Sequence, residues 1–324
     1  MNERREEPEQ WRQTFRLLLR LSVAAVAAYG CLGNALIIAL FTLSRTLRSK
    51  VELSALVALA SYDAALCTSV LVMLLYNLNP SANFPPSACL LLAQLPVWCA
   101  LASNLTVLYI GFDRLRAIYW PIEYLSQRHV RRTWVATAAV FVYSCVFFTP
   151  LLSVINERDA ANHSAPPCIP ADHWPDYWVP AYSTHTALLC LALVVVYALM
   201  RHQMRRMASQ VQPDAPTLTA RMSENAVIRA RMLTSLIAAT LAPHLLLYAL
   251  PNVLIVIARL FATTPILSQL TGGVSALTAV VNSSVNIFIY SAKSADFREE
   301  VRKLLCRKRK QESDNNAMST AEQA

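Results

Sequence analysis

Seven long apolar stretches dominate this 324-residue chain and constrain its fold more than any other feature. They lie near residues 21–43, 52–76, 89–112, 133–155, 177–200, 232–258 and 266–290. A helix needs about 20 mostly apolar residues to cross the hydrocarbon core of a bilayer, and each stretch is long enough. Only 15% of the residues are charged, whereas a soluble domain carries about 25%. We therefore predict an all-α membrane protein, a bundle of seven transmembrane helices.

Basic residues are concentrated in alternate loops between the predicted spans. Lys and Arg number three in 44–50, five in 114–132, six in 201–231 and eight from Lys293 onward, which together make 22 of the 29. The positive-inside rule assigns these segments to the cytoplasm, so residues 1–16 are predicted to be extracellular. The five arginines up to Arg20 run against this orientation. Because the positive charge is divided among inner loops, we expect no nucleic-acid partner.

Two cysteines and a glycosylation motif fall on the predicted outer side. Cys89 and Cys168 lie where oxidation is permitted, and a disulfide between them would tie the second outer loop to the third helix. Asn162 begins an Asn-His-Ser sequon in the same loop and is the predicted glycosylation site. On the inner side, Cys306 lies among basic residues, where either palmitoylation or a plain free thiol is expected.

The segment after the seventh stretch repeats apolar residues every three or four positions, at Phe297, Val301 and Leu304. This period predicts a short amphipathic helix along the inner membrane interface, with a solvated helix as the alternative. We expect one membrane domain over residues 17–306, and the polar residues 307–324 are predicted to form a disordered cytoplasmic tail.

Polar side chains at mid-membrane depth are costly, so each one is a functional candidate. Asp63 is the acid deep in the second stretch. Comparable depth on the first, third and seventh stretches is occupied by Asn34, Ser103, Asn282, Ser283 and Asn286. This set predicts a hydrated core that holds a cation beside the Asp63 carboxylate. An ion-free cluster of interhelical hydrogen bonds is the alternative.

The Asp113–Arg114 pair lies 25 residues beyond Cys89 on the third stretch. A helix rises roughly 37 Å over 25 residues, so one helix places the thiol at one membrane face and the pair at the other. We expect Arg114 to pair with Asp113 in one state and to turn toward the cytoplasm in another. An arginine that merely extends its charge to the interface is the alternative.

In order and spacing, these features resemble the rhodopsin-like G-protein-coupled receptors over residues 17 to about 306. The matching pieces, from the first helix to the last, are Gly33-Asn34, Leu59–Asp63, Cys89, Asp113-Arg114, Trp134, Tyr197, Pro243, Asn286–Tyr290 and Phe297-Arg298. No single piece is decisive, but their succession across seven helices is specific.

The resemblance implies a multi-pass plasma-membrane receptor with an extracellular N-terminus, not an enzyme. It implies sodium as an allosteric ion, with no other cofactor, in a pocket formed by Asp63, Ser103, Asn282 and Asn286. It implies a switch that admits a heterotrimeric G protein, made of Asp113, Arg114, Tyr197, Asn286 and Tyr290. Further partners implied in the same way are arrestin, a receptor kinase and membrane lipid.

Several positions depart from the family pattern. Leu115 stands in place of the usual Tyr, Leu241 in place of Trp, and Ile287 in place of the Pro after Asn286. Helix five has Leu189 where its usual Pro would be, and Glu224 lies one position from where an acid would clamp Arg114. These changes are compatible with altered basal activity.

The Asn282–Asn286 run resembles invertebrate neuropeptide receptors of the FMRFamide and myosuppressin type, and also nematode chemoreceptors. Receptors for biogenic amines carry Asp where this chain has Pro96, so an amine is not expected. Val280 replaces the lysine that holds retinal in opsins. The predicted ligand pocket comprises Gln94, Trp98, Tyr177, His185, His244, Tyr248, Asn252 and Gln269. Aromatic side chains near span ends also suit an interfacial belt.

These observations predict a receptor for a short neuropeptide. A chemosensory receptor for small environmental molecules and a constitutively active orphan receptor are the alternatives. A transporter or intramembrane enzyme is disfavoured, because the stretches contain no paired catalytic carboxylates, no Ser/His dyad at helical spacing and no inverted repeat.

Overall fold

A computed structural model describes residues 3–49, 54–78, 86–120, 124, 129–159, 178–210, 239, 243–253 and 265–304. These residues are helical almost throughout, and the described part of the chain contains no β-strand. The all-α fold class predicted from the apolar stretches is therefore confirmed.

Five long helices coincide with predicted spans, and they are α3 (Ser54–Leu78), α4 (Pro86–Tyr119), α6 (His129–Asp159), α7 (Trp178–Gln210) and α10 (Pro265–Lys293). Of the predicted span 232–258, Ala239 and residues 243–253 are described, and the rest lies outside the described residues. That segment contains the π-helical turn η3 (Leu245–Ala249) just after Pro243. Proline removes a backbone N–H from the helical ladder, and π turns occur at such interruptions.

The first helix is much longer than the apolar pattern predicts. α1 runs from Glu3 to Leu43, so residues 3–16 continue the span as helix instead of forming a separate segment. Glu, Arg and Gln are strong helix formers, and once a helix exists the chain extends it at little cost. A short helix, α2 (Arg45–Ser49), follows a break at Ser44, whose Oγ accepts the N–H of Leu47 at 3.2 Å.

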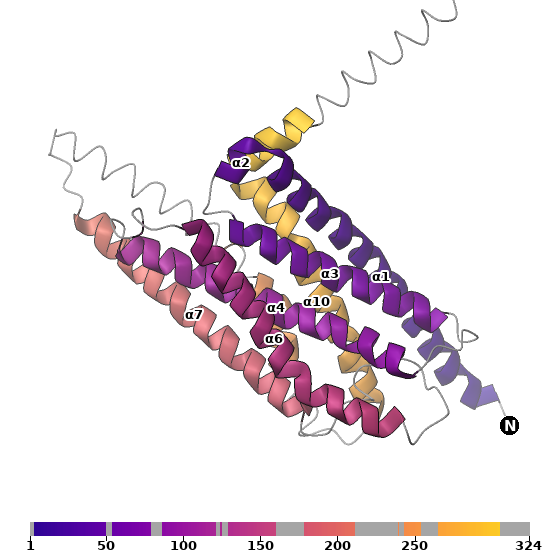
Figure 1. Cartoon of the computed structure of the whole chain (residues 1–324). Helices are drawn as coiled ribbons and strands as arrows, with labels where there is room; N and C mark the ends of the chain where they lie inside the picture. The colour runs from indigo at the N-terminus through magenta and orange to yellow at the C-terminus, as the bar shows by residue number, and fades with distance from the viewer. Residues whose placement is uncertain are drawn as a thin grey trace, which may run out of the picture.

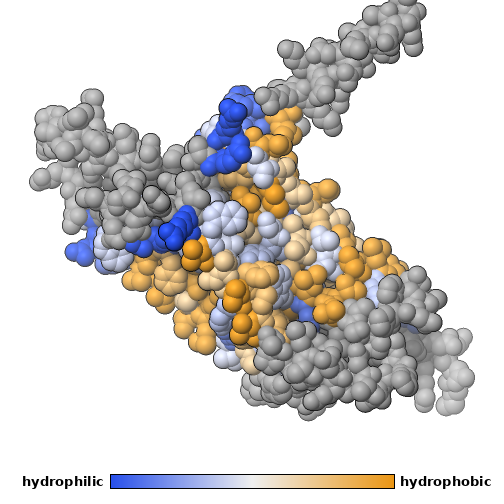
Figure 2. All heavy atoms as spheres, in the orientation of Figure 1, coloured by the Kyte–Doolittle hydropathy of each residue, from blue (hydrophilic) through white to orange (hydrophobic). Residues whose placement is uncertain are grey.

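The described helices form an elongated bundle with an apolar flank (Figure 1 and Figure 2). By length and composition, four of them can cross a membrane, and these are Gln13–Leu43, Ser54–Leu78, Leu91–Tyr119 and Ala181–Arg206. Large apolar side chains such as Leu32 and Trp134 are more than two-thirds exposed. Figure 2 shows hydrophobic side chains along the bundle and hydrophilic ones at the end that carries α2. This distribution suits lipid around the bundle and water at its end.

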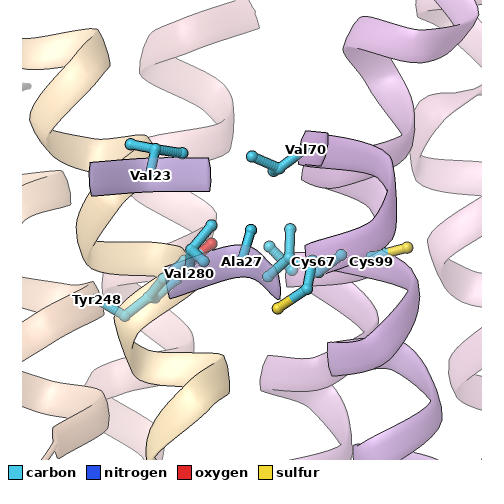
Figure 3. Packing of buried hydrophobic residues seen from close by; sticks show 9 residues of the cluster. Val23, Ala27, Cys67, Val70, Cys99, Tyr248 and Val280 are labelled. Atoms are coloured by element: carbon cyan, nitrogen blue, oxygen red, sulfur yellow. The ribbon is translucent and has the colours of Figure 1, made fainter. Parts of the chain in front are cut away.

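Buried small and apolar side chains hold α1, α3, α4 and α10 together (Figure 3). Ala27, Cys67, Cys99 and Val280 are completely buried in this cluster. One turn further along α1, a Cβ added to Gly30 would lie 2.5 Å from Ser284 Oγ and 2.6 Å from Cys67 Sγ. Only a glycine permits such close approach, and small residues are the common means of packing helices in lipid.

The short helix predicted after the seventh span is present over residues 295–304. Ser294 Oγ accepts the N–H of Phe297 at 3.2 Å, and the Phe297 side chain is buried beneath the helix. Arg298 Nη1 donates to the carbonyls of Ser291 and Ala292, which are left open at the end of α10. On the exposed side, a hydrogen bond to Glu300 raises the pKa of Lys303. The segment is therefore amphipathic.

Several predicted sites lie outside the described residues, namely Asn162, Cys168, Tyr177, Cys306 and the tail 307–324. Cys89 and Gln269 lie in α4 and α10, but their side chains are not among those described. The disulfide, the glycosylation and the palmitoylation therefore stay predictions. Five described cysteines are free thiols in the helices, which are Cys31, Cys67, Cys99, Cys145 and Cys190.

Candidate functional site

A buried carboxylate connects three helices in the middle of the bundle. Asp63 of α3 is 1% exposed. Its Oδ1 accepts hydrogen bonds from Ser103 Oγ of α4 at 2.8 Å and from Ser283 Oγ of α10 at 2.9 Å. Its Oδ2 accepts one from Asn286 Nδ2 at 2.5 Å. A carboxylate removed from water is tolerated only when such donors replace its hydration.

The structure brings together most of the predicted sodium pocket but exchanges one member. Ser103 and Asn286 contact Asp63, whereas Asn282 Nδ2 lies 3.5 Å from His244 Nδ1. Ser283 contacts Asp63 instead. Residues three apart share a helix face, so Ser283 and Asn286 point the same way while Asn282 is turned by about 100°. That spacing was the sequence signal for Ser283.

Asn34 ties α1 to the same region. Its Nδ2 donates to the carbonyls of Gly30 and Ser283, both at 3.0 Å, and its Oδ1 is buried without a partner among the described residues. The Asp63 surroundings also supply hard oxygen atoms, from one carboxylate and two hydroxyl groups. Oxygen donors of this kind fit an alkali or alkaline-earth cation better than a soft metal. Among the described residues, no group of three His, Cys, Asp or Glu side chains forms a metal site.

The second charged site lies near the C-terminal end of α4. Arg114 Nη2 is 3.0 Å from Asp113 Oδ2, and the two side chains are 7% and 11% exposed. Tyr124 OH donates to the same Oδ2 at 2.9 Å. Arg132 of α6 places its Nη2 3.5 Å from Asp113 Oδ1. The structure therefore forms the predicted Asp113–Arg114 pair and adds Arg132 and Tyr124, which were not among the predicted residues.

The two predicted switch tyrosines lie on separate helices, α7 and α10. Tyr197 of α7 packs against a cluster that includes Ile118 and Leu115 of α4. Tyr290 of α10 is buried against Phe297, with ring centroids 6.2 Å apart. Its hydroxyl has no hydrogen-bond partner among the described residues. This buried donor is available to a partner in another arrangement of the helices.

Near the N-terminal end of α7, aromatic and polar side chains join this helix to the segment around η3. Tyr182 OH and Tyr248 OH form a short hydrogen bond. The Tyr248 ring stacks on His244 at 5.3 Å, and Asn252 Nδ2 donates to the Tyr248 carbonyl at 2.7 Å. The predicted pocket residues His244 and Asn252 thus both contact Tyr248, a third predicted residue, and Tyr182 contacts Tyr248 as well. Tyr182 is three positions before His185, and helical spacing was the signal for it.

Other predicted pocket residues lie against α6. Trp98 of α4 meets Phe141 edge-on at 5.3 Å, and His185 of α7 stacks on Phe147 at 4.8 Å. The amide group of Gln94 is buried, and both of its polar atoms lack partners among the described residues. Trp98 therefore packs between helices, against the clusters that contain Tyr248 and Tyr182, and His185 stacks on Phe147, which packs against the Tyr182 cluster.

Comparison with known proteins gives a clear relationship. Residues 33–290 match the family model described as "7 transmembrane receptor (rhodopsin family)". A 108-residue segment is 37% identical to 5-hydroxytryptamine receptor 1 of Drosophila melanogaster, covering 32% of this chain and 19% of the relative. A 140-residue segment is 29% identical to dopamine receptor 2 of Caenorhabditis elegans, covering 43% and 16%.

A longer match, over 207 residues at 27% identity, is to 5-hydroxytryptamine receptor 1A-alpha of Takifugu rubripes, covering 61% of this chain and 48% of the relative. In each case the chain spans less than half the length of the relative. These three are named for serotonin or dopamine, so the expected resemblance to FMRFamide and myosuppressin receptors finds no support among them.

The hydrogen bond from Ser283 to Asp63 generates a stability prediction. Ser283→Ala removes one of two donors to a buried carboxylate oxygen, so we expect the free energy of unfolding to fall by about 1–3 kcal/mol. Ser69→Ala is the matched control, because Ser69 is equally buried but donates to the Leu66 carbonyl of its own helix. Thermal unfolding of the purified protein in detergent measures both variants. Equal melting temperatures would contradict the assigned role of Ser283.

Proposed function

The chain belongs to the rhodopsin family of seven-transmembrane receptors, and on that premise we propose that it passes an extracellular ligand signal to a heterotrimeric G protein. Membership implies a seven-helix bundle and a multi-pass membrane protein that acts as a receptor, not an enzyme. The observation that carries the proposal is the buried Asp113–Arg114 pair at the inner end of α4. We place the receptor in the plasma membrane, with its N-terminus outside the cell.

The proposed mechanism is a shift between two helix arrangements. In the arrangement described above, Asp113 holds the Arg114 guanidinium away from the cytoplasmic surface. A ligand that binds the other arrangement more tightly shifts the population toward it. Arg114 then leaves Asp113 and meets the G protein, and Tyr197 and Tyr290 supply new hydroxyl partners. Arrestin and a receptor kinase would engage the same open state.

Sodium is proposed as an allosteric ion at Asp63. The carboxylate, Ser103 Oγ and Ser283 Oγ would hold the ion, because each hydroxyl can turn its oxygen lone pairs toward a cation. Asn286 already contacts Asp63, so an ion there would link α3, α4 and α10 and favour the arrangement in which they are close. The ion-free cluster remains the alternative outcome of the test below.

The ligand is proposed to be a short peptide that is read through uncharged groups. Tyr248, His244 and Asn252 offer hydrogen-bonding groups beside aromatic surface. In α4 before Asp113, and in α7, α10 and residues 243–253, the sequence contains no Asp or Glu. A protonated amine would therefore lack a counter-ion on these helices, where Pro96 replaces the expected carboxylate. The names of the relatives favour a monoamine as the second candidate.

We predict that Arg114→Ala abolishes G-protein activation while the receptor still reaches the cell surface, because the guanidinium that meets the G protein is lost. Arg201→Ala is the matched control, since Arg201 is an exposed arginine on the inner part of α7. Energy-transfer sensors of G-protein dissociation, normalised to surface epitope counts, give the measurement. Undiminished activation in Arg114→Ala would remove the proposed switch.

We predict that Asp63→Asn abolishes the effect of sodium on agonist affinity. Asparagine keeps the size of the side chain but loses the charge that attracts the ion. Agonist competition curves are measured in sodium chloride and in N-methylglucamine chloride at equal ionic strength. If the wild-type receptor responds identically in the two salts, the ion-free cluster is the correct description of Asp63.

The ligand class is tested by a panel of short peptides, monoamines and odorants applied to cells that express the receptor. We expect activation by a peptide and none by serotonin or dopamine, because α4 before Asp113, α7, α10 and residues 243–253 carry no carboxylate that could face an ammonium group. Cells expressing the Arg114→Ala variant show which responses pass through this receptor. Activation by a monoamine would establish the second candidate, and an odorant would establish a chemosensory receptor. Ligand-independent signalling with a silent panel would indicate a constitutively active receptor.

A further inference from the structure

One carboxylate at the inner end of the bundle is shared by two guanidinium groups. Asp113 is 11% exposed, and its Oδ2 faces Arg114 at 3.0 Å while its Oδ1 faces Arg132 at 3.5 Å. Arg114 is 7% exposed and Arg132 is 27% exposed, so water screens neither pair fully. The three side chains together carry a formal charge of +1. Each arginine is therefore attracted by Asp113 and repelled by the other arginine.

Helix α6 itself does not explain why Arg132 lies beside Asp113. It lies in the first turn of α6, which begins at His129 and has no acidic residue in that turn. The partial positive charge of a helix N-terminus disfavours a cation at this position. Its Nη1 is buried and has no hydrogen-bond partner among the described residues. Among the described residues, Asp113 is thus the carboxylate that compensates the partly buried charge of Arg132.

The packing of α4 on α6 fixes Arg132 beside Asp113. Figure 1 shows the two helices side by side, and they are in contact. Tyr109 OH of α4 donates to Thr133 Oγ1 of α6 at 3.3 Å, one helical turn from Asp113 and one residue from Arg132. Both partners of this hydrogen bond belong to α4 and α6, so it fixes Arg132 relative to Asp113 without the help of another helix.

We propose that Arg132 is a positioning residue for activation. It stays on Asp113 when Arg114 leaves. Its presence thereby lowers the barrier between the two helix arrangements and favours the active one. This inference rests on the proposed function, in which Arg114 is released to the G protein. While both arginines share Asp113, they repel each other, and the departure of Arg114 relieves that repulsion. After departure the carboxylate is still paired, so no uncompensated buried charge remains. Without Arg132, Asp113 would hold Arg114 alone and more tightly.

The test uses the full-length receptor with three variants. Arg132→Met removes the charge but keeps an apolar side chain of similar length. Arg132→Lys keeps the charge. Arg131→Met removes the same charge from an exposed neighbour on α6 and controls for bulk electrostatics. Ligand-independent and panel-evoked G-protein activation are measured per receptor at the cell surface, and melting temperatures are recorded alongside.

We expect Arg132→Met to lower activation per surface receptor on the order of tenfold, the size of a typical coupling between two conformational states. Arg132→Lys and Arg131→Met should stay close to the wild type. Activation in Arg132→Met that equals or exceeds the wild type overturns the inference. So does a variant that loses only melting temperature and surface number, which would show that Arg132 merely joins two helices. If Arg132→Lys fails as completely as Arg132→Met, charge is not the cause and the inference also falls.

The failure of this inference and that of the proposed function are distinguishable. A wild-type receptor that activates no G protein, alone or with any panel ligand, refutes the proposed function and this inference with it. A wild-type receptor that signals normally, with Arg132→Met unchanged beside it, refutes only the role of Arg132.

Discussion

The buried carboxylate of Asp63 is the interaction on which the arrangement of the helices depends. An ionisable group at this depth is tolerated only when it is fully compensated, and here the hydrogen-bond donors come from α4 and α10. Ser103, Ser283 and Asn286 must therefore stay within hydrogen-bond distance of α3. At the same level of the bundle, α1 packs closely against α10 at Gly30, and this contact holds α10 from the side of α1. The arrangement of the helices at the centre of the bundle is thus fixed by polar hydrogen bonds. Apolar contacts cannot fix it, because lipid tails make such contacts with a helix as readily as another helix does.

The two buried carboxylates are compensated by different chemistry, and this difference separates their roles. Asp63 accepts hydrogen bonds from hydroxyl and amide groups, which leave its negative charge in place and open to a cation. Asp113 is paired with guanidinium groups, which neutralise it and leave an excess of positive charge. This difference supports the two proposed roles, in which the first site takes up a small ion and the second holds a cation that can be exchanged. Because α4 carries Ser103 and Arg114, a shift of that helix alters both sites.

The sequence predicted the elements of the fold well, because a bilayer demands long apolar stretches with polar ends. It did not reveal that α1 begins as early as Glu3, since the charged residues before the span show helix propensity but no apolar period. Depth alone identified Asp63, Ser103, Ser283 and Asn286. Depth does not reveal that Ser283, and not Asn282, contacts Asp63, because that depends on the helix face that Ser283 shares with Asn286. Arg132 was counted as one inner-loop charge among many, and only the packing of α6 on α4 shows its partner.

The names of the relatives and the residues of this chain point to different ligands. We give the residues greater weight, for a physical reason. Overall similarity to amine receptors reflects the shared bundle, which depends on residues such as Asp63 and Arg114 that the extracellular ligand does not touch in the proposed mechanism. Recognition of an ammonium group depends instead on a single buried counter-ion, and a missing one leaves a desolvated charge unpaired. Pro96 has no charge to offer. A ligand that donates and accepts neutral hydrogen bonds meets His244 and Tyr248 without that penalty, so specificity can change at one position while the transmission machinery is retained.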